Sequence, residues 1–309
     1  MQRLSVNRDD PLYKYAIQFM EEVWRTTGKG IFPGSQPISI EYKHFDILKS
    51  NPYVVCEKTD GVRFMMLAFM YNNRKQCVFL NRALDMYTCP LNFRKPVYDG
   101  TILEGEMYND TFMIYDIIIN SGNYIGDKDF LTRLESIEKI KKMLTCLKYD
   151  PIKLKIKTFH VMSEYEKFLD EYLPTVTETI DGLIFTPINE GIKTGTHETM
   201  FKWKPRDKNT IDFQLKKKDN IWRLYVQERG KLIYESEFYE HMVPEYARTW
   251  MEEDAIIECQ YMFNDTPMWW KPIARRYDKT FPNSRRTFYR TLVNIKEDIS
   301  MNDFLDCIP

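Results

Sequence analysis

The chain has 309 residues, of which 43% are hydrophobic and 29% are charged, and 44 Lys and Arg against 45 Asp and Glu give a net charge of −1. This composition is ordinary for a globular protein, argues against disorder and excludes a uniformly basic nucleic-acid binder. The length favours two domains. No run of about 18 apolar residues is present, so we expect no membrane span, and the N-terminus MQRLSVNRDD lacks the apolar core of a secretory signal.

Six cysteines and four histidines are scattered along the chain. None of the cysteines forms a C-x-x-C pair, so we expect neither a zinc site of the usual spacing nor a disulfide framework. The cysteines are Cys56, Cys77, Cys89, Cys146, Cys259 and Cys307. We interpret them as small core residues of a protein in a reducing compartment.

The first predicted element is a helix beginning at Pro11, because Asp10 is a suitable N-cap and proline is favoured in the first helical turn. Residues 26–37 are punctuated by glycine and proline and are expected to form a loop. Short apolar and β-branched runs then predict strands. These runs lie at 53–56, 64–69, 77–80, 101–103 and 112–119.

Two helices are expected to interrupt the strands. One carries an apolar stripe from Leu134 to Leu147, and the other begins at a capping box formed by Ser163 and Glu166. After Asp212 the apolar residues alternate again, which favours a small antiparallel barrel. The tail at 285–304 is predicted to be helical.

The most informative short string runs from Glu57 to Arg63, with the sequence EKTDGVR, at the end of a predicted strand. Gly61 permits a tight turn, after which Lys58 and Arg63 can point toward one cavity. Taken alone, this string is weak evidence and is more typical of a surface turn with a solvated lysine.

Four further polar strings occur at predicted strand ends or in alternating patterns. They are LEGE at 103–106, IDGLIF at 180–185, FKWKP at 201–205 and R-x-D-K-x-x-P-N at 276–283. Each string can also be explained without a functional role, as a turn former or as a solvated strand face. Together they supply the groups that nucleotidyl transfer onto a lysine requires.

That reaction sets clear chemical demands. The attacking lysine must be neutral, yet only about 0.04% is neutral at pH 7 when the pKa is near 10.4. Neighbouring cations such as Lys202, Lys204 and Arg63, together with a metal, would lower that pKa. The carboxylates Asp60, Glu106 and Asp181 fit ribose contacts or a hard divalent cation rather than phosphate.

The ordered strings resemble the covalent nucleotidyltransferase superfamily, which comprises ATP- and NAD-dependent ligases and mRNA capping guanylyltransferases. They are most similar to the capping enzymes. FPGSQPIS at 32–39 resembles the segment that precedes the nucleophile motif, and FKWKP leads into NTIDF at 209–213 in the capping pattern. Ligases generally lack the R-x-D-K-x-x-P-N string in this form. The resemblance runs from about Phe32 to Asn283, and Glu104 departs from the Asp of many relatives.

The resemblance implies a catalytic role for Lys58, as the nucleophile that forms a lysyl-N-GMP phosphoramidate. Arg63 and Arg82 resemble arginines that touch ribose and phosphate. Glu106 and Asp181 resemble carboxylates linked to the metal, with Glu106 alternatively on the ribose.

The remaining nucleotide-binding residues follow from the same resemblance. Tyr115 resembles the aromatic residue that stacks on guanine, with Phe112 as the alternative, and Lys157 resembles a lysine that reads the guanine edge. The other residues resemble phosphate ligands, the last three from a mobile domain: Lys202, Lys204, Arg276, Asp278 and Lys279.

The implied fold is α+β, with a nucleotidyltransferase domain of ATP-grasp-like antiparallel sheets and helices and a C-terminal OB-fold domain. We expect the first domain at 1–212, completed by a C-terminal helix at 290–309, and the OB-fold lid at 213–289. The implied reaction transfers GMP from GTP to a 5′-diphosphate RNA end with Mg²⁺ or Mn²⁺. An ATP-dependent polynucleotide ligase and a non-catalytic RNA-end-binding module are the alternatives.

Implied partners are GTP, 5′-diphosphate RNA and RNA triphosphatase and cap methyltransferase domains or subunits, with no membrane. The expected location is cytoplasmic for a viral protein and nuclear for a cellular one. Two basic stretches remain to be placed, the lysines at 216–218 and seven cations within 271–290. We expect the second stretch to face phosphates and the first to be a solvated loop.

Overall fold

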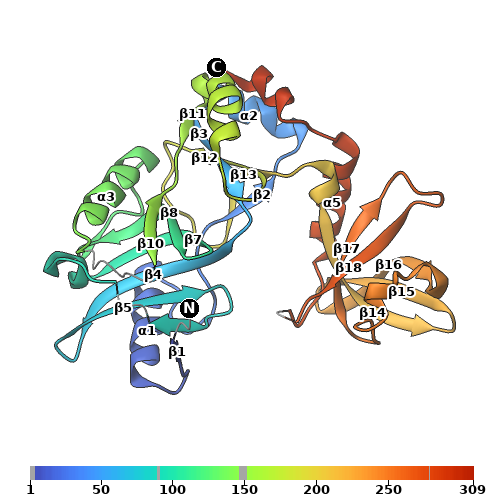
Figure 1. Ribbon diagram of the computed structural model, residues 1–309, viewed down its shortest axis with the longest axis horizontal. Coiled ribbons are helices and arrows are strands. Elements are labelled where there is room, and N and C mark those ends of the chain that lie inside the picture. The colour runs from blue at the N-terminus through green and yellow to red at the C-terminus, as the bar shows by residue number, and fades with distance from the viewer. Residues whose placement is uncertain (1–3, 89–90, 146–151, 278) are drawn as a thin grey trace. The chain divides into compact units, whose positions relative to one another are not determined.

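The computed structural model describes residues 4–88, 91–145, 152–277 and 279–309 (Figure 1). Contacts between residues divide the chain into two compact units. Unit 1 contains residues 1–38, 46–202 and 304–309, and unit 2 contains residues 39–45 and 203–303.

The larger sheet of unit 1 has eight strands, with β9 pairing to β8 beside the main path. Its neighbours are antiparallel except for the parallel pair β8 and β10. In spatial order the strands are β1 (Leu4–Val6), β6 (Met86–Thr88), β5 (Arg74–Asn81), β4 (Val62–Tyr71), β7 (Thr101–Tyr108), β8 (Thr111–Asn120) and β10 (Lys153–Ile156), with β9 (Asn123–Tyr124).

The central strand β4 is buried on both faces, which explains the uninterrupted apolar run that it carries. Phe64 and Met66 point into a core that includes Ile137 of α3 (Phe130–Lys142). Met65 and Leu67 point into a second core that is closed by α1 (Pro11–Trp24). The sheet is therefore covered by helices on opposite faces.

The predicted start of α1 is confirmed, because the Asp10 side chain accepts a hydrogen bond from the Leu12 amide and Pro11 begins the helix. The predicted capping box at Ser163 and Glu166 is wrong. Short helical turns fill this segment, including α4 (Tyr165–Lys167), and their N-terminal residues make no side-chain cap. Tyr165 and Phe168 are buried here, so aromatic packing shapes the segment instead.

A second sheet has five strands and carries several of the predicted site residues. Its strands, in spatial order, are β11 (His160–Val161), β3 (Tyr53–Thr59), β12 (Ile180–Pro187), β13 (Thr196–Trp203) and β2 (Gln36–Ser39). The short helix α2 (Phe45–Ser50) precedes β3. Three neighbouring strands, β3, β12 and β13, thus follow one another across the sheet.

Unit 2 is built on a five-stranded antiparallel sheet. Its spatial order is β16 (Lys231–Tyr239), β15 (Ile221–Glu228), β14 (Thr210–Lys218), β17 (Ile256–Met262) and β18 (Trp269–Arg275). The outer strands β16 and β18 also contact each other, which curls the sheet into the partly open barrel of an OB-fold. The predicted α+β class and the small C-terminal barrel are confirmed.

Helix α5 (Arg285–Glu297) begins at Ser284, whose side chain accepts a hydrogen bond from the Thr287 amide, and packs Phe288 against the barrel core. The helix ends at Asp298 in a left-handed conformation, earlier than the predicted end at residue 304. By contacts, α5 belongs to unit 2 and only residues 304–309 belong to unit 1. The proposed domain limits at 212, 213–289 and 290–309 stay a prediction.

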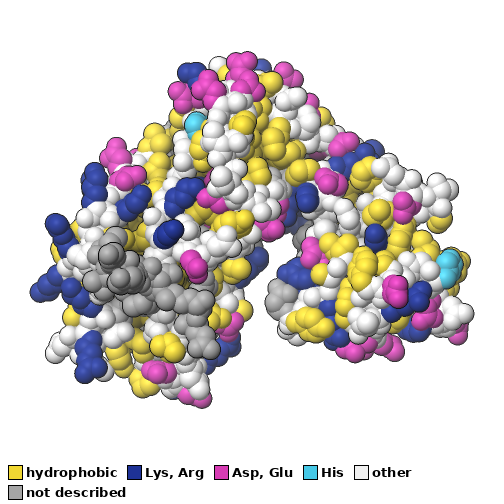
Figure 2. Space-filling view, in the orientation of Figure 1, with side chains coloured by type: hydrophobic (Ala, Val, Ile, Leu, Met, Phe, Trp, Pro, Cys, Tyr) yellow, Lys and Arg dark blue, Asp and Glu magenta, His cyan; other side chains and the backbone are white. Residues whose placement is uncertain are grey.

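Both signs of charge appear on the surface of both units in Figure 2, in keeping with the balanced composition. Within the described ranges, no helix combines the length and the apolar character that a membrane span would need.

One buried ion pair joins α3 to the larger sheet. Arg133 is almost completely buried, and its Nε and Nη2 donate to the two carboxylate oxygens of Asp116 at 2.8 and 3.0 Å. Such a bidentate pair fixes geometry as well as charge.

We expect Arg133→Met to lower the free energy of unfolding by about 3–5 kcal/mol, because it leaves the Asp116 carboxylate buried without a cation. Urea denaturation at neutral pH measures this loss. Arg8→Met, which breaks an exposed pair with Asp85, is the control and should cost about 1 kcal/mol or less. Equal losses in the two variants would contradict the prediction.

Candidate active site

The candidate site lies around Lys58, near the end of β3. The Lys58 Nζ donates a hydrogen bond to Asp181 Oδ1 at 2.7 Å, and the two side chains are 24% and 14% exposed. Lys58 lies opposite Gly182 on β12, and the register shifts between Ile180 and Gly182. Asp181 is therefore the extra residue of a bulge, which turns its carboxylate toward the lysine.

A second lysine, Lys157, is buried behind this pair with 4% of its side chain exposed. Its Nζ donates to Thr59 Oγ1 at 2.9 Å and lies 3.7 Å from Glu57 Oε1 and 3.8 Å from Glu106 Oε2. The Tyr172 hydroxyl donates to the second oxygen of Glu57 at 3.3 Å. Two carboxylates therefore share one buried ammonium group.

Burial raises the pKa of Glu57 and of Glu106, although the Lys157 charge opposes the shift in both. The Lys58 charge also lowers the pKa of Glu106, whereas the Asp181 charge raises it. Glu106 is thus electrostatically coupled to both members of the Lys58–Asp181 pair. The side chains of Glu106 and Asp181 form a negatively charged region beside the candidate nucleophile.

Arg63 on β4 makes a separate set of contacts. Its Nη1 donates to the Ser35 carbonyl oxygen and its Nη2 to Glu104 Oε2, each at 2.8 Å. The guanidinium carbon lies 5.2 Å from the centre of the Phe32 ring and 5.9 Å from that of Tyr115. Burial raises the pKa of Tyr115 well above its usual value, so its hydroxyl stays protonated.

Gly34 is required where the segment FPGS crosses this ion pair. A Cβ atom at position 34 would collide with Glu104 Oε1 and Arg63 Nη2. The same segment receives Arg82, whose Nη2 donates to Gln36 Oε1 at 3.0 Å. Arg63 and Arg82, both predicted from the sequence to bind nucleotide, therefore hold residues 32–36 in place.

Of the two remaining predicted lysines, Lys202 lies near the end of β13 and Lys204 follows the last residue of that strand. Lys202 and Lys204 alternate with the buried Phe201 and Trp203, as the strand period requires. The limit between the two units falls between Lys202 and Trp203, so Lys204 belongs to unit 2. Phe112, the alternative to Tyr115, is wrong for a stacking role because it is buried in the core against Phe79.

In unit 2 a single carboxylate binds both described members of the R-x-D-K string. Asp212 is buried; its Oδ1 accepts from Arg276 Nη1 at 2.9 Å and its Oδ2 accepts from Lys279 Nζ. The Asp212 amide donates to Asn283 Oδ1, and the Asn283 amide donates to the Asp212 carbonyl oxygen. Asp278 lies outside the described residues.

Sequence reasoning missed several of these contacts. Glu57 and Thr59 contact Lys157, and Tyr172 donates to Glu57. Asp212 is buried between Ile211 and Phe213, although alternation along β14 would place it on the outer face, so the sequence pattern does not predict that its carboxylate is buried and needs a cation. No sequence signal points from Tyr172 to Glu57.

Among the described residues, no group of three or more His, Cys, Asp and Glu side chains gathers in one place. The Asp181 carboxylate is nevertheless close enough to that of Glu106 to raise the Glu106 pKa. Mg²⁺ commonly takes one or two carboxylates and completes its shell with water and substrate phosphates. The pair fits such an ion in the presence of a nucleotide.

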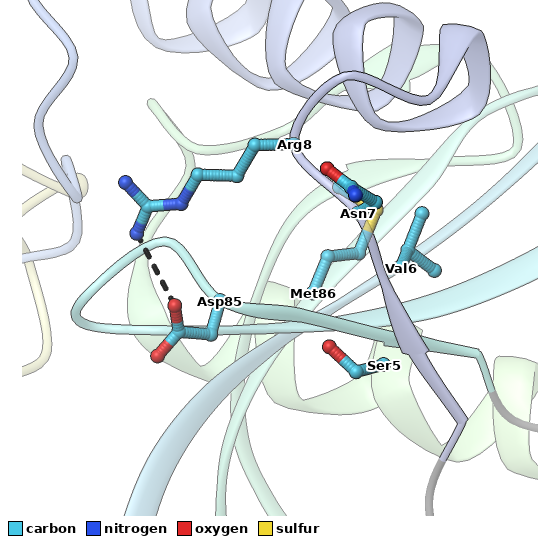
Figure 3. A pocket seen from close by; sticks show the side chains of 6 residues that line it. All are labelled: Ser5, Val6, Asn7, Arg8, Asp85 and Met86. Carbon is cyan, nitrogen blue, oxygen red and sulfur yellow. Dashed lines mark hydrogen bonds and ion pairs between the residues drawn. The ribbon is translucent and has the colours of Figure 1, made fainter.

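A pocket elsewhere in unit 1 involves none of these residues (Figure 3). It lies beside the Arg8–Asp85 ion pair. Its lining consists of Ser5, Val6, Asn7, Arg8, Asp85 and Met86.

Two family models match the chain and together cover most of it. Residues 4–206 match the model described as mRNA capping enzyme, catalytic domain, and residues 177–305 match mRNA capping enzyme, C-terminal domain. The chain belongs to the mRNA capping enzyme family. This confirms the family that the ordered strings indicated.

Curated members of the mRNA capping enzyme family are similar over nearly the whole chain. The mRNA-capping enzyme of Mus musculus is 30% identical over 316 residues, covering 92% of this chain and 50% of the mouse protein. That of Danio rerio is 31% identical, covering 94% and 50%. The mRNA-capping enzyme subunit alpha of Schizosaccharomyces pombe is 27% identical, covering 92% and 81%. The chain thus spans about half the length of the two vertebrate relatives.

The raised pKa of Glu57 predicts a specific pH dependence of stability. Below about pH 4.5, the ordinary value, Glu57 is protonated in both folded and unfolded protein. As pH rises through the raised pKa, the folded state must release a proton that it holds more tightly, so wild-type stability falls. Glu57→Gln does not titrate and should gain stability relative to wild type between pH 4.5 and neutrality.

Thermal or urea unfolding across pH 4 to 8 measures this difference. Glu171→Gln, which removes one exposed negative charge from the same segment as Tyr172, is the control. A wild-type to Glu57→Gln difference that stays constant over the whole range would show that the buried carboxyl does not titrate as described.

Proposed function

We propose that this protein is an mRNA guanylyltransferase that transfers GMP from GTP, through a covalent lysyl-N-GMP intermediate on Lys58, to a 5′-diphosphate RNA end. The observation that carries the proposal is the Lys58–Asp181 pair at 2.7 Å, placed beside Glu106 in a chain of the mRNA capping enzyme family. The lysine is partly buried and its amine has one close acceptor, as a nucleophile that must lose a proton needs.

In the first step the Lys58 ammonium gives a proton to the Asp181 carboxylate or to solvent. The neutral amine then attacks the α-phosphorus of GTP and passes a second proton to solvent or to the departing pyrophosphate. A nitrogen–phosphorus bond forms, the bond from that phosphorus to the bridging oxygen breaks, and pyrophosphate leaves. In the second step a terminal oxygen of the RNA 5′-diphosphate attacks the same phosphorus, and the nitrogen–phosphorus bond breaks. Asp181 positions the Lys58 amine before the first step. After the second step it can pair again with the protonated lysine.

Side chains on and beside the two sheets supply the proposed nucleotide contacts. Arg63 and Arg82 bind ribose and phosphate oxygens, and Lys202 and Lys204 bind the phosphates. Tyr115 offers a ring that is already oriented beside Arg63. Lys157 and its partner Thr59 donate hydrogen bonds to guanine acceptors such as O6 and N7.

Mg²⁺ or Mn²⁺ would be held by Glu106 and Asp181 together with phosphate oxygens. Bound there, the ion would neutralise the charge that develops on the phosphates. In unit 2, Arg276, Asp278 and Lys279 would act on the β- and γ-phosphates, with Asp212 fixing the positions of the two cations.

We also propose partners and a location on the same basis. An enzyme that acts on a 5′-diphosphate requires an RNA triphosphatase to produce it, and a cap methyltransferase would use the product. The Schizosaccharomyces pombe relative is named a subunit alpha, which favours assembly with other subunits. The relatives reported above are cellular proteins, which favours the nuclear over the viral cytoplasmic alternative.

Incubation with each α-labelled nucleoside triphosphate and Mg²⁺ tests the proposal. We expect GTP alone to leave label on the denatured protein, in an acid-labile form, and chelation of the metal to prevent it. Lys58→Arg keeps a cation but cannot present a neutral amine, so it should abolish labelling. Lys155→Ala, a surface lysine of unit 1, is the control. Labelling by ATP with nick joining would instead establish a ligase.

The two steps should respond differently to Lys279→Ala. The β- and γ-phosphates are present only in the first step, so this variant should form protein–GMP at least about tenfold more slowly. Transfer from preformed protein–GMP to 5′-diphosphate RNA should proceed at the wild-type rate. Rapid-quench measurement of each step checks this, with exposed Lys231→Ala as control. Equal slowing of both steps would contradict the assignment.

A further inference from the structure

The outer face of the unit 2 barrel carries a regular grid of side chains on β14, β15 and β16. Strand pairing aligns the residues in three rows across these strands. Trp222, Leu224 and Val226 point into the core, so the alternate residues of β15 point outward. The rows are Gln214–Tyr225–Tyr234, Lys216–Arg223–Glu237 and Lys218–Ile221–Tyr239.

Three tyrosines belong to this grid, Tyr225 and Tyr234 in the first row and Tyr239 in the third. Tyr234 and Tyr239 are 48% and 55% exposed. Tyr225 and Tyr234 meet edge to face, with ring centres 6.0 Å apart, which leaves ring surface accessible to a ligand. The Arg223 guanidinium carbon lies 5.9 Å from the centre of the Tyr234 ring.

Three cations also belong to this grid. Lys216 and Lys218 lie on β14 and Arg223 on β15. Two carboxylates accompany them, Asp254 at 2.6 Å from Lys216 Nζ and Glu237 at 3.6 Å from Arg223 Nε. Arg223 Nε has no hydrogen-bond partner within the described part of the chain. Three cations against two carboxylates leave this face with a small net positive charge near its tyrosines.

We propose that this grid binds the single-stranded 5′ segment of RNA, with bases stacked on Tyr225, Tyr234 and Tyr239 and phosphates on Lys216, Lys218 and Arg223. Cations interspersed with aromatic rings on one sheet face suit a single strand, because phosphates bind the cations and bases stack on the rings without their sequence being read. The second and third strands of an OB-fold are the face on which oligonucleotides are commonly bound. The inference rests on the proposed function, because it assigns the acceptor RNA a path on unit 2.

Residues 216–218 lie in β14 rather than in the solvated loop that the sequence favoured for them. The stretch at 271–290, which the sequence favoured for phosphate contacts, has carboxylate partners of its own: Arg275 pairs with Glu252, Arg276 with Asp212, and Arg285 with Glu235. Because Lys216 and Arg223 are paired in the same way, ion pairing does not separate the two regions, and the grid is preferred for its place on the second and third strands of the barrel.

The test measures binding of a short 5′-diphosphate RNA to the full chain by fluorescence anisotropy, without GTP. Tyr225→Ala and Tyr234→Ala should each weaken binding roughly fivefold or more, since stacking on one ring contributes about 1–3 kcal/mol. Tyr234→Phe keeps the ring and should bind like wild type. Lys218→Ala should lower the slope of log affinity against log salt by about one.

Tyr246→Ala is the matched control, because Tyr246 is an exposed tyrosine of unit 2 outside the grid. Formation of protein–GMP needs no RNA, so it reports separately on folding and on the proposed function. Normal labelling with weakened RNA binding in the two alanine variants supports the inference. RNA binding that is unchanged in both variants overturns it. So does a sedimentation experiment in which the wild-type chain self-associates through this face and the alanine variants do not.

Labelling that fails in wild type while RNA binding still depends on Tyr225 and Tyr234 would reject the guanylyltransferase proposal and leave the binding face standing. The two failures are therefore distinguishable.

Discussion

The candidate site is centred on one hydrogen-bonded ion pair between neighbouring strands, in which Asp181 accepts from the amine of Lys58. The pair exists because β12 bulges opposite the end of β3, so that an acidic side chain leaves the ladder and turns toward the lysine. Glu106 reaches the same region from the other sheet and is influenced by both charges. Two sheets thus contribute to one charged centre.

Much of this arrangement was predictable from local patterns. Lys58 and Asp181 both belong to short strings with Asp-Gly turn residues at strand ends. Alternation predicted Lys202 and Lys204 on one strand face, but only Lys202 lies within the strand. The helix at Pro11 followed from its cap, and the small barrel followed from alternation after Asp212. In each case a few adjacent residues carry the physical cause, so the sequence displays it directly.

Contacts between distant segments were not predictable in this way. Lys157 meets Thr59 across 98 positions, and Arg276 meets Asp212 across 64. Nothing in either neighbourhood specifies the partner, because the requirement arises only when a charged group is buried and must find an opposite charge. The failed capping box has the same origin, since burial of Tyr165 and Phe168 outweighed a local hydrogen-bonding preference.

The burial of β4 on both faces limits the substitutions that this strand can accept. Arg63 leaves one end of this strand, while residues such as Ala68 are enclosed near the other end with no exposed surface. A strand packed between two cores and paired on both edges cannot absorb a larger side chain by tilting into solvent, so the added volume forces neighbouring side chains off their rotamers and shifts the backbone slightly. Backbone shifts of this kind, even at buried positions far from Arg63, would change the direction in which its guanidinium points.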